Sequence, residues 1–314
     1  MPAIITHGAM SAQGFGYGAA ALGGGDGTKG IFALGSLTTT RNKYTYSTCS
    51  STACGVAASS AGSNAGSAAG NSTRGIFAIG NTTVTRNKYT YSTCSSTACG
   101  VAASSITSYF GSAAGNSTRG IFAIGNSSTT RNKYTYSTCS STACGVAASS
   151  AAARGGSAAG NSTRGIFAIG VIGCASSTTR NKYTYACCSS TAVGVAVSSA
   201  AASFGAAAGN STRGIFALGN VCGAPSTTRN KYTYATCSST ACGVAASSIT
   251  SYFGSATGNS TRGIFAIGDT CFSATVTREK YTYSNCSSTA CGVGAACSTA
   301  GSGSAASWAV CVNV

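Results

Sequence analysis

Acidic side chains are almost missing from this chain of 314 residues, which has only Asp26, Asp269 and Glu279 against 19 lysines and arginines. With His7 as the single histidine, these groups cannot supply a repeated acid–base site, and none forms a motif with a nucleophile. We therefore expect no enzyme. The same scarcity leaves a net charge of +16, which favours acidic partners such as nucleic acid, anionic glycans or acidic protein surfaces.

Several other classes of protein are excluded in the same way. Two prolines against 43 glycines do not fit collagen or a proline-rich linker. No apolar run approaches the roughly 20 residues of a membrane span, and residues 1–7 lack the regions of a signal peptide. No phosphate-binding glycine loop leads into a helix, so we expect no cofactor and no membrane partner. Charged residues make up 7% of the chain, too few for typical disorder, and we expect a packed structure coated with serine and threonine.

What the chain does have is a repeat. The phrase Asn-Ser-Thr-Arg-Gly-Ile-Phe-Ala-Ile/Leu-Gly occurs five times, and a sixth copy opens the array as Gly-Thr-Lys-Gly-Ile-Phe-Ala-Leu-Gly. The spacings between successive copies are 45, 45, 45, 49 and 49 residues. A fixed period of this size indicates one supersecondary unit that buries its apolar face against the next copy. The glycine before Ile-Phe marks each unit, at Gly30, Gly75, Gly120, Gly165, Gly214 and Gly263.

Each unit reads as short strands without helix signals. In the second unit, residues 75–80 form an apolar run bounded by glycines, and residues 86–93 alternate aromatic with polar side chains. Residues 94–99 read as a hairpin turn, residues 100–105 as a third strand and residues 108–114 as a fourth. Four antiparallel strands per unit specify a propeller blade. We predict an all-β propeller with six or seven blades, six being favoured, and a β-solenoid as the alternative.

This organisation predicts three segments. Residues 1–14 form an N-terminal arm for attachment, residues 15–302 form the propeller, and residues 303–314 form a C-terminal clasp strand or the start of a seventh blade. Residues 15–21 resemble the fourth-strand segment that precedes each marker, so the first blade could also be completed from its own N-terminus.

Cysteines recur in register and bracket Ser-Ser-Thr-Ala in five units. A four-residue hairpin loop brings its flanking residues opposite one another, so local disulfides are the leading interpretation and reduced buried thiols the alternative. The spacing suits zinc poorly and histidine is missing, so we expect no metal. The predicted pairs are Cys49–Cys54, Cys94–Cys99, Cys139–Cys144, Cys237–Cys242 and Cys286–Cys291.

Seven cysteines remain. Val193 replaces the second cysteine of the fourth unit, and the last three units carry four extra residues with one added cysteine each. Because stability alone would not need this asymmetry, we expect some of the seven to bond to neighbouring subunits. The alternative is internal pairing, such as Cys174 with Cys187 and Cys297 with Cys311. The full set is Cys174, Cys187, Cys188, Cys222, Cys271, Cys297 and Cys311.

Basic and aromatic residues also repeat together and form a candidate surface, represented by Arg86, Lys88, Tyr89, Arg131, Lys133 and Tyr134. Such interleaving can bind single-stranded nucleic acid or stack on sugars. We favour the other interpretation, in which the cations lie at strand ends in solvent and the tyrosines pack between blades. Nucleic acid is therefore not the expected partner.

The combination of Asn-Ser-Thr-Arg-Gly-Ile-Phe-Ala with Thr-Arg-Asn-Lys-Tyr-Thr-Tyr resembles kelch-like propeller repeats in structural proteins of tailed bacteriophages, over residues 15–297. Units of the standard kelch type have a double glycine and a regular tryptophan, whereas Trp308 is the only tryptophan here. The resemblance implies a non-enzymatic virion protein, such as a minor capsid or decoration protein, made in the host cytoplasm and bound to other virion proteins. The alternative is a lectin-like propeller that recognises a host glycan at a tail or fibre, and a bacterial surface protein is a weaker third.

Overall fold

The computed structural model describes residues 29–33, 40–48, 50–56, 67–71, 73–78, 85–91, 93–101, 111–123, 130–146, 156–168, 170–172, 175–176, 180–193, 206–217, 220–221, 224–225, 228–244, 255–266, 269–270, 273–274, 277–293 and 304–306. The predicted N-terminal arm, residues 1–14, lies outside this set, as do residues 15–21.

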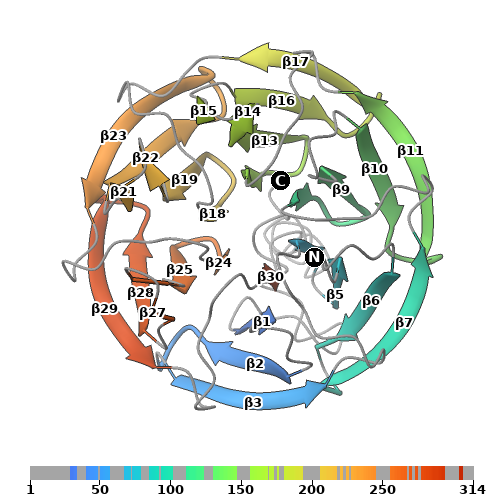
Figure 1. The fold of residues 1–314 in the computed structure, drawn as a ribbon, viewed down its shortest axis with the longest axis horizontal. Coiled ribbons are helices and arrows are strands. Elements are labelled where there is room, and N and C mark those ends of the chain that lie inside the picture. The colour runs from blue at the N-terminus through green and yellow to red at the C-terminus, as the bar shows by residue number, and fades with distance from the viewer. Residues whose placement is uncertain are drawn as a thin grey trace, which may run out of the picture.

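The described strands form an all-β propeller in which four-stranded antiparallel sheets surround a central axis (Figure 1). Five blades, numbered 2 to 6 after their repeats, are each built from one stretch of chain. Their innermost strands are β4 (Ser67–Gly70), β8 (Ser112–Gly115), β12 (Ser157–Gly160), β18 (Ala206–Gly209) and β24 (Ser255–Gly258). Next come β5 (Arg74–Ala78), β9 (Arg119–Ala123), β13 (Arg164–Ala168), β19 (Arg213–Ala217) and β25 (Arg262–Ala266).

The outer half of each blade holds the other two strands (Figure 1). The third strands are β6 (Thr85–Thr90), β10 (Thr130–Thr135), β16 (Arg180–Thr184), β22 (Thr228–Thr233) and β28 (Thr277–Thr282). The outermost strands are β7 (Ser95–Val101), β11 (Ser140–Val146), β17 (Ser189–Val193), β23 (Ser238–Val244) and β29 (Ser287–Val293).

The first repeat forms a composite sheet with the other end of the chain. Its strands β1 (Lys29–Ala33), β2 (Thr40–Thr45) and β3 (Ser50–Val56) are joined by β30 (Ser304–Ala306), which pairs antiparallel with β1 at the innermost position. Strand β30 contacts the inner strands β4 and β24, so the composite sheet lies between blade 2 and blade 6. The prediction of six or seven blades is therefore corrected to five such blades and one composite sheet. The described residues contain no start of a seventh blade.

Local sequence explains the turn between the first two strands of each blade. In blade 3, the side-chain oxygen of Asn116 accepts hydrogen bonds from the backbone N–H groups of Thr118 and Arg119 and from the Thr118 hydroxyl. This is an Asx-type turn, which asparagine favours. The marker position requires glycine because the neighbouring blade lies close to it. A Cβ added at Gly165 would lie only 2.9 Å from the Cβ of Ala114.

The hairpin turn between the third and outermost strands differs from the prediction. In blade 3 the turn consists of residues 136–139, and Ser140 already pairs with Thr135. Cys139 occupies the left-handed region, with φ of 54°, at the last position of a four-residue turn. The Ser-Ser-Thr-Ala segment therefore belongs to the outermost strand, where Ser140, Thr142 and Ala143 are exposed.

The lengthened connections of blades 4, 5 and 6 form small extra hairpins at the end of the sheets opposite these turns. They are β14 (Val171–Ile172) with β15 (Ala175–Ser176), β20 (Asn220–Val221) with β21 (Ala224–Pro225), and β26 (Asp269–Thr270) with β27 (Ser273–Ala274). The lengthened loops that the sequence marks in the last three units therefore contain short hairpins.

The core lies between the blades. Each of the four contacts between blades 2 to 6 buries the Ile of one blade against both tyrosines of the next, as with Ile76 against Tyr134 and Tyr136. All twelve tyrosines of the Lys-Tyr-Thr-Tyr strands are at most 5% exposed. The prediction that these tyrosines pack between blades is confirmed.

Burial makes these phenols hard to ionise. Desolvation raises the pKa of Tyr44, Tyr134, Tyr183 and Tyr281 from 10.0 to about 12, although nearby arginines lower it. Between pH 10 and 12 the unfolded chain releases phenol protons that the native state retains. The stabilisation from these buried neutral phenols is therefore complete below pH 10 and is lost as the pH rises to about 12. Burial also lowers the pKa of Arg86 to about 10, which acts in the opposite direction.

Because these two effects oppose each other in the free energy of unfolding, the phenols are better measured directly. We expect an ultraviolet titration of native protein to show a tyrosine class that ionises near pH 12. The denatured protein, as the control, should ionise in one step near pH 10. A single step near pH 10 in the native protein would contradict this packing.

Candidate functional site

Arginine contacts, an ion pair and a disulfide lie at the junctions between neighbouring blades. At the end of the propeller that carries the Asn-Ser-Thr-Arg turns, here called the turn face, each arginine reaches the next blade. Its Nη1 donates to the backbone carbonyl of the second tyrosine there, at 2.7 to 3.2 Å. The pairs are Arg74–Tyr136, Arg119–Tyr185, Arg164–Tyr234, Arg213–Tyr283 and Arg262–Tyr46.

The asparagine of the same turn adds a second bond. The Asn116 side-chain amide donates to the Ser162 carbonyl of the next blade at 3.0 Å, while its oxygen holds its own turn. The last clamp, Arg262 to Tyr46 at 2.9 Å, joins blade 6 to the composite sheet. These clamps were not predicted, although the unchanged arginine in five turns was the signal that pointed to them.

A second set of arginines lies inside the junctions, away from the turn face. Each is the first or second residue of a third strand and is at most 1% exposed. Its guanidinium carbon lies 5.4 to 5.5 Å from the ring centre of a phenylalanine on the next blade, a cation–π distance. The contacts are Arg86–Phe122, Arg131–Phe167, Arg180–Phe216 and Arg229–Phe265, and Arg278 is equally buried.

The predicted basic and aromatic surface is therefore wrong as a surface. Arg86, Arg131, Tyr89 and Tyr134 are at most 1% exposed, and only Lys88 and Lys133 are half-buried. The expectation that the cations lie at strand ends in solvent is also wrong for this arginine set. The reason is that a guanidinium can stack on an aromatic ring, a choice that a repeating Arg-x-Lys-Tyr pattern does not reveal.

One junction contains an ion pair. Arg229 of blade 5 donates from Nη2 to Oε2 of Glu279 in blade 6 at 2.9 Å, and both side chains are at most 1% exposed. Repeats 1 to 5 have asparagine in place of Glu279. Burial lowers the pKa of Arg229, while the Glu279 charge raises it. One of the three acidic side chains of the chain is thus buried in an ion pair.

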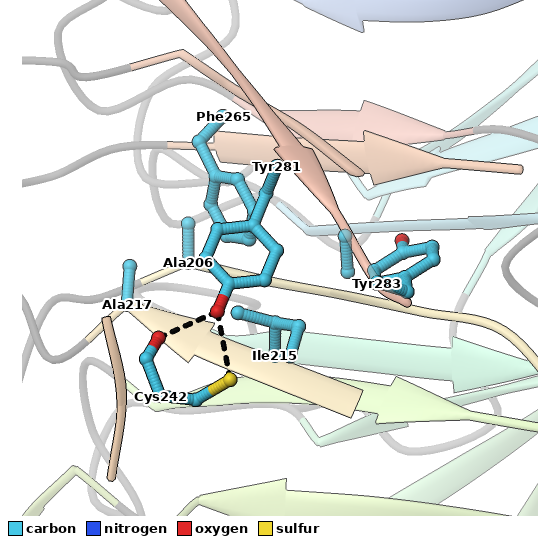
Figure 2. Packing of buried hydrophobic residues seen from close by; sticks show 8 residues of the cluster. Ala206, Ile215, Ala217, Cys242, Phe265, Tyr281 and Tyr283 are labelled. Atoms are coloured by element: carbon cyan, nitrogen blue, oxygen red, sulfur yellow. Dashed lines mark hydrogen bonds between the residues drawn. The ribbon is translucent and has the colours of Figure 1, made fainter. Parts of the chain in front are cut away.

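Cysteines join blades rather than hairpin strands. Cys242 on β23 of blade 5 is bonded to Cys286 in the turn of blade 6, with Cα atoms 5.7 Å apart. The Tyr281 hydroxyl donates to the Cys242 carbonyl beside this bond (Figure 2). The predicted pairs Cys237–Cys242 and Cys286–Cys291 are therefore wrong, because the first cysteine lies in the turn and the second five residues later on the outermost strand.

Four more cysteines, Cys94, Cys139, Cys188 and Cys291, are also disulfide-bonded. By repeat equivalence with Cys242–Cys286, we expect each first cysteine to bond to the second cysteine of the preceding repeat. This gives the expected pairs Cys54–Cys94, Cys99–Cys139, Cys144–Cys188 and Cys49–Cys291. The side chains of Cys49, Cys54, Cys99 and Cys144 lie outside the described set.

The junction between blades 4 and 5 has no such disulfide. Val193 stands at the second-cysteine position of blade 4, and the cysteine that would meet it, Cys237, is free. Both residues pack against one cluster that contains Ile166 and Phe216. This junction is the seam of the ring, since an apolar contact replaces the covalent one.

Of the seven remaining cysteines, the structure places two. Cys188 is bonded and Cys187 is free and exposed, so the alternative pairing of Cys174 with Cys187 is wrong. Cys187 and Ser189 share a side-chain hydrogen bond at 2.9 Å, which lowers the pKa of the Cys187 thiol. Cys174, Cys222, Cys271, Cys297 and Cys311 lie outside the described residues.

The described residues contain no group of three or more histidine, cysteine or acidic side chains that could hold a metal ion. In the same part of the chain, no helix has the length and apolar character needed to cross a membrane.

In comparisons with known proteins, no family model matches the chain and no curated protein matches it. The likeness to kelch-like phage repeats therefore remains a resemblance of motifs.

The buried ion pair can be tested with Glu279→Asn, which installs the residue that repeats 1 to 5 have at this position. Hydrogen bonds to charged groups contribute about 1.5–3 kcal/mol, so we expect the free energy of unfolding to fall by about this amount in guanidinium titrations. Lys280→Gln removes a neighbouring half-buried charge and serves as the control, with a change of about 0.5 kcal/mol or less. Equal effects of the two variants would contradict a specific pair.

The seam can be closed by Val193→Cys. We expect a new bond between residue 193 and Cys237, with the same 44-residue separation as Cys242–Cys286. The chain-entropy treatment gives about 4 kcal/mol of stabilisation for such a loop. Peptide mapping should find the link, and thermal unfolding should shift upward only without reductant. Val193→Cys combined with Cys237→Ser is the control, and an unreacted Cys237 in the single variant would refute the proposed equivalence.

Proposed function

We propose that this chain is a non-enzymatic structural protein of a virus particle of the tailed-phage type that its repeats resemble, decorating or reinforcing the capsid or another outer part. In this proposal the composite sheet serves as the sixth blade and closes the ring. The chain is made in the host cytoplasm and acts in the released particle.

The observation that carries the proposal is covalent stapling between blades. Cys242–Cys286 crosses a junction, and Cys94, Cys139, Cys188 and Cys291 are also bonded. Disulfides persist outside the reducing cytosol, and a bond between distant residues limits the unfolded chain more than a local one. A ring held in this way suits a component that must survive unprotected in the medium.

In this proposal the chain attaches to other virion proteins through the features that differ between its repeats. Extra hairpins are described on blades 4, 5 and 6, and the added cysteines Cys174, Cys222 and Cys271 stand in the same loops of the sequence. Together with residues 1–14 these loops form the proposed contact with other virion proteins. Cys187, free and exposed, is the described cysteine best placed for a bond to another subunit.

The glycan-binding alternative loses its main support. A lectin-like site needs repeated pockets lined by tyrosine and arginine, but the repeat tyrosines are at most 5% exposed. Aromatic stacking platforms for sugars or bases are therefore missing among the described residues.

Particle fractionation tests the proposal. Particles released from the host culture are purified on a density gradient and separated on reducing and non-reducing gels, with peptide mapping. We expect the chain to co-purify with particles, to carry Cys242–Cys286, and to migrate without reductant above its 30.5 kDa mass through bonds from Cys187 or the loop cysteines. Its confinement to the host cell fraction would refute a virion role, whereas intrachain bonds alone in purified particles would refute only covalent attachment.

A further inference from the structure

The turn face carries guanidinium groups around the axis, each oriented by one hydrogen bond to the next blade and each with further N–H donors. Each clamp occupies Nη1 of its arginine, and in Arg164 and Arg213 the Nε atom also contacts a threonine hydroxyl at 3.4 to 3.5 Å. The guanidinium groups of Arg74, Arg119 and Arg262 make no further hydrogen bond within the described residues. All five arginines are half-buried, so their remaining N–H groups can meet a ligand.

The surroundings of these groups suit an anion. Thr118, Thr163, Thr212 and Thr261, which precede four of the arginines, are exposed, so these turns are open to solvent. Each threonine hydroxyl donates its proton to the asparagine of its own turn, which leaves the guanidinium N–H groups as the donors for an anion. Among the described residues no carboxylate lies on the turn face: Glu279 is paired inside a junction, and Asp269 belongs to a hairpin at the opposite end. An arginine already oriented by one bond loses less entropy when its planar fork binds a carboxylate.

The arrangement also limits the shape of the partner. The five arginines belong to successive blades around the axis (Figure 1). A linear polymer crossing this face would reach only some of them at once. A protein assembly with acidic groups repeated around an axis would reach all of them together, with a gain from multivalency.

Aromatic recognition is missing from the same face. The second tyrosines lie at the turns, yet Tyr136, Tyr185 and Tyr234 are at most 2% exposed. These tyrosines therefore cannot stack on bases or sugars, whereas the arginines can form charge-assisted hydrogen bonds to carboxylates.

We propose that the turn face is a docking surface for an acidic, rotationally repeated protein surface, and that Arg74, Arg119, Arg164, Arg213 and Arg262 bind its carboxylates. This inference rests on the proposed function only for the identity of the partner as a particle shell. The opposite end, with its extra hairpins, is then free for attachment through the loop cysteines, whereas Cys187 lies in a turn of blade 4 on the turn face itself.

The test measures binding of the purified full chain to dense immobilised layers of poly-L-glutamate, heparin and single-stranded DNA at about 0.15 M salt. A dense layer presents many chains side by side, so that all five arginines can be reached at once. The triple variant Arg119→Gln, Arg164→Gln and Arg213→Gln is compared with the control Lys133→Gln, Lys182→Gln and Lys231→Gln. The control removes three half-buried charges from the same blades. Near-ultraviolet circular dichroism and melting temperature report whether each variant keeps the fold.

We expect the arginine variant to bind poly-L-glutamate about tenfold or more weakly, and the lysine variant to differ from wild type by about threefold or less. Equal losses would overturn the proposal, because net charge alone would then account for binding. Tighter binding of wild type to heparin or DNA than to poly-L-glutamate would overturn the protein partner in favour of a polysaccharide or nucleic acid.

A second variant tests the proposal if the glutamine variant fails to fold. Arg119→Lys, Arg164→Lys and Arg213→Lys keep the charge but remove the planar fork, so binding to poly-L-glutamate should still weaken, whereas unchanged binding would overturn the role of the guanidinium. These outcomes do not depend on particle fractionation, so failure of the docking surface and failure of the virion role can be told apart.

Discussion

The contact between neighbouring blades is the interaction on which this fold depends. A single blade of four short strands cannot bury Ile, Phe and two tyrosines alone, and each needs the next blade to cover them. The contact combines small residues with large ones: the Cβ of Ala114 approaches Gly165 so closely that a side chain there would collide with it. The marker glycine, the paired tyrosines and the inner-strand alanines are therefore parts of one interface repeated around the ring.

Electrostatics within that interface explains an unusual composition. Ten arginines serve the junctions, five buried over or near aromatic rings and five clamped to backbone carbonyls. Carbonyl oxygens and ring faces stabilise guanidinium groups without carboxylates, so a chain with three acidic residues can still place many cations in its structure. Much of the +16 charge is thus architectural, because ten of the 19 lysines and arginines are held at the junctions.

Covalent and non-covalent ties follow the same junctions. The disulfide Cys242–Cys286 joins blade 5 to blade 6, and the clamp from Arg262 and the pairing of β30 with β1 join the two ends of the chain. Val193 opposite Cys237 leaves one junction with packing in place of a bond. The ring therefore has a defined seam, placed among the blades that also carry the extra hairpins.

The sequence by itself determined the repeat, the four strands per unit, the propeller and the burial of tyrosine between blades, because these follow from periodicity and local side-chain alternation. The extra residues of the last three units also marked an asymmetric half of the ring. Only the tertiary structure decided how cysteines pair, since Cys242 and Cys286 lie 44 residues apart and become neighbours through the rotation between blades. The same holds for Arg86 on Phe122 and for β30 beside β1: a contact between repeats depends on their spatial order, which a local pattern does not contain.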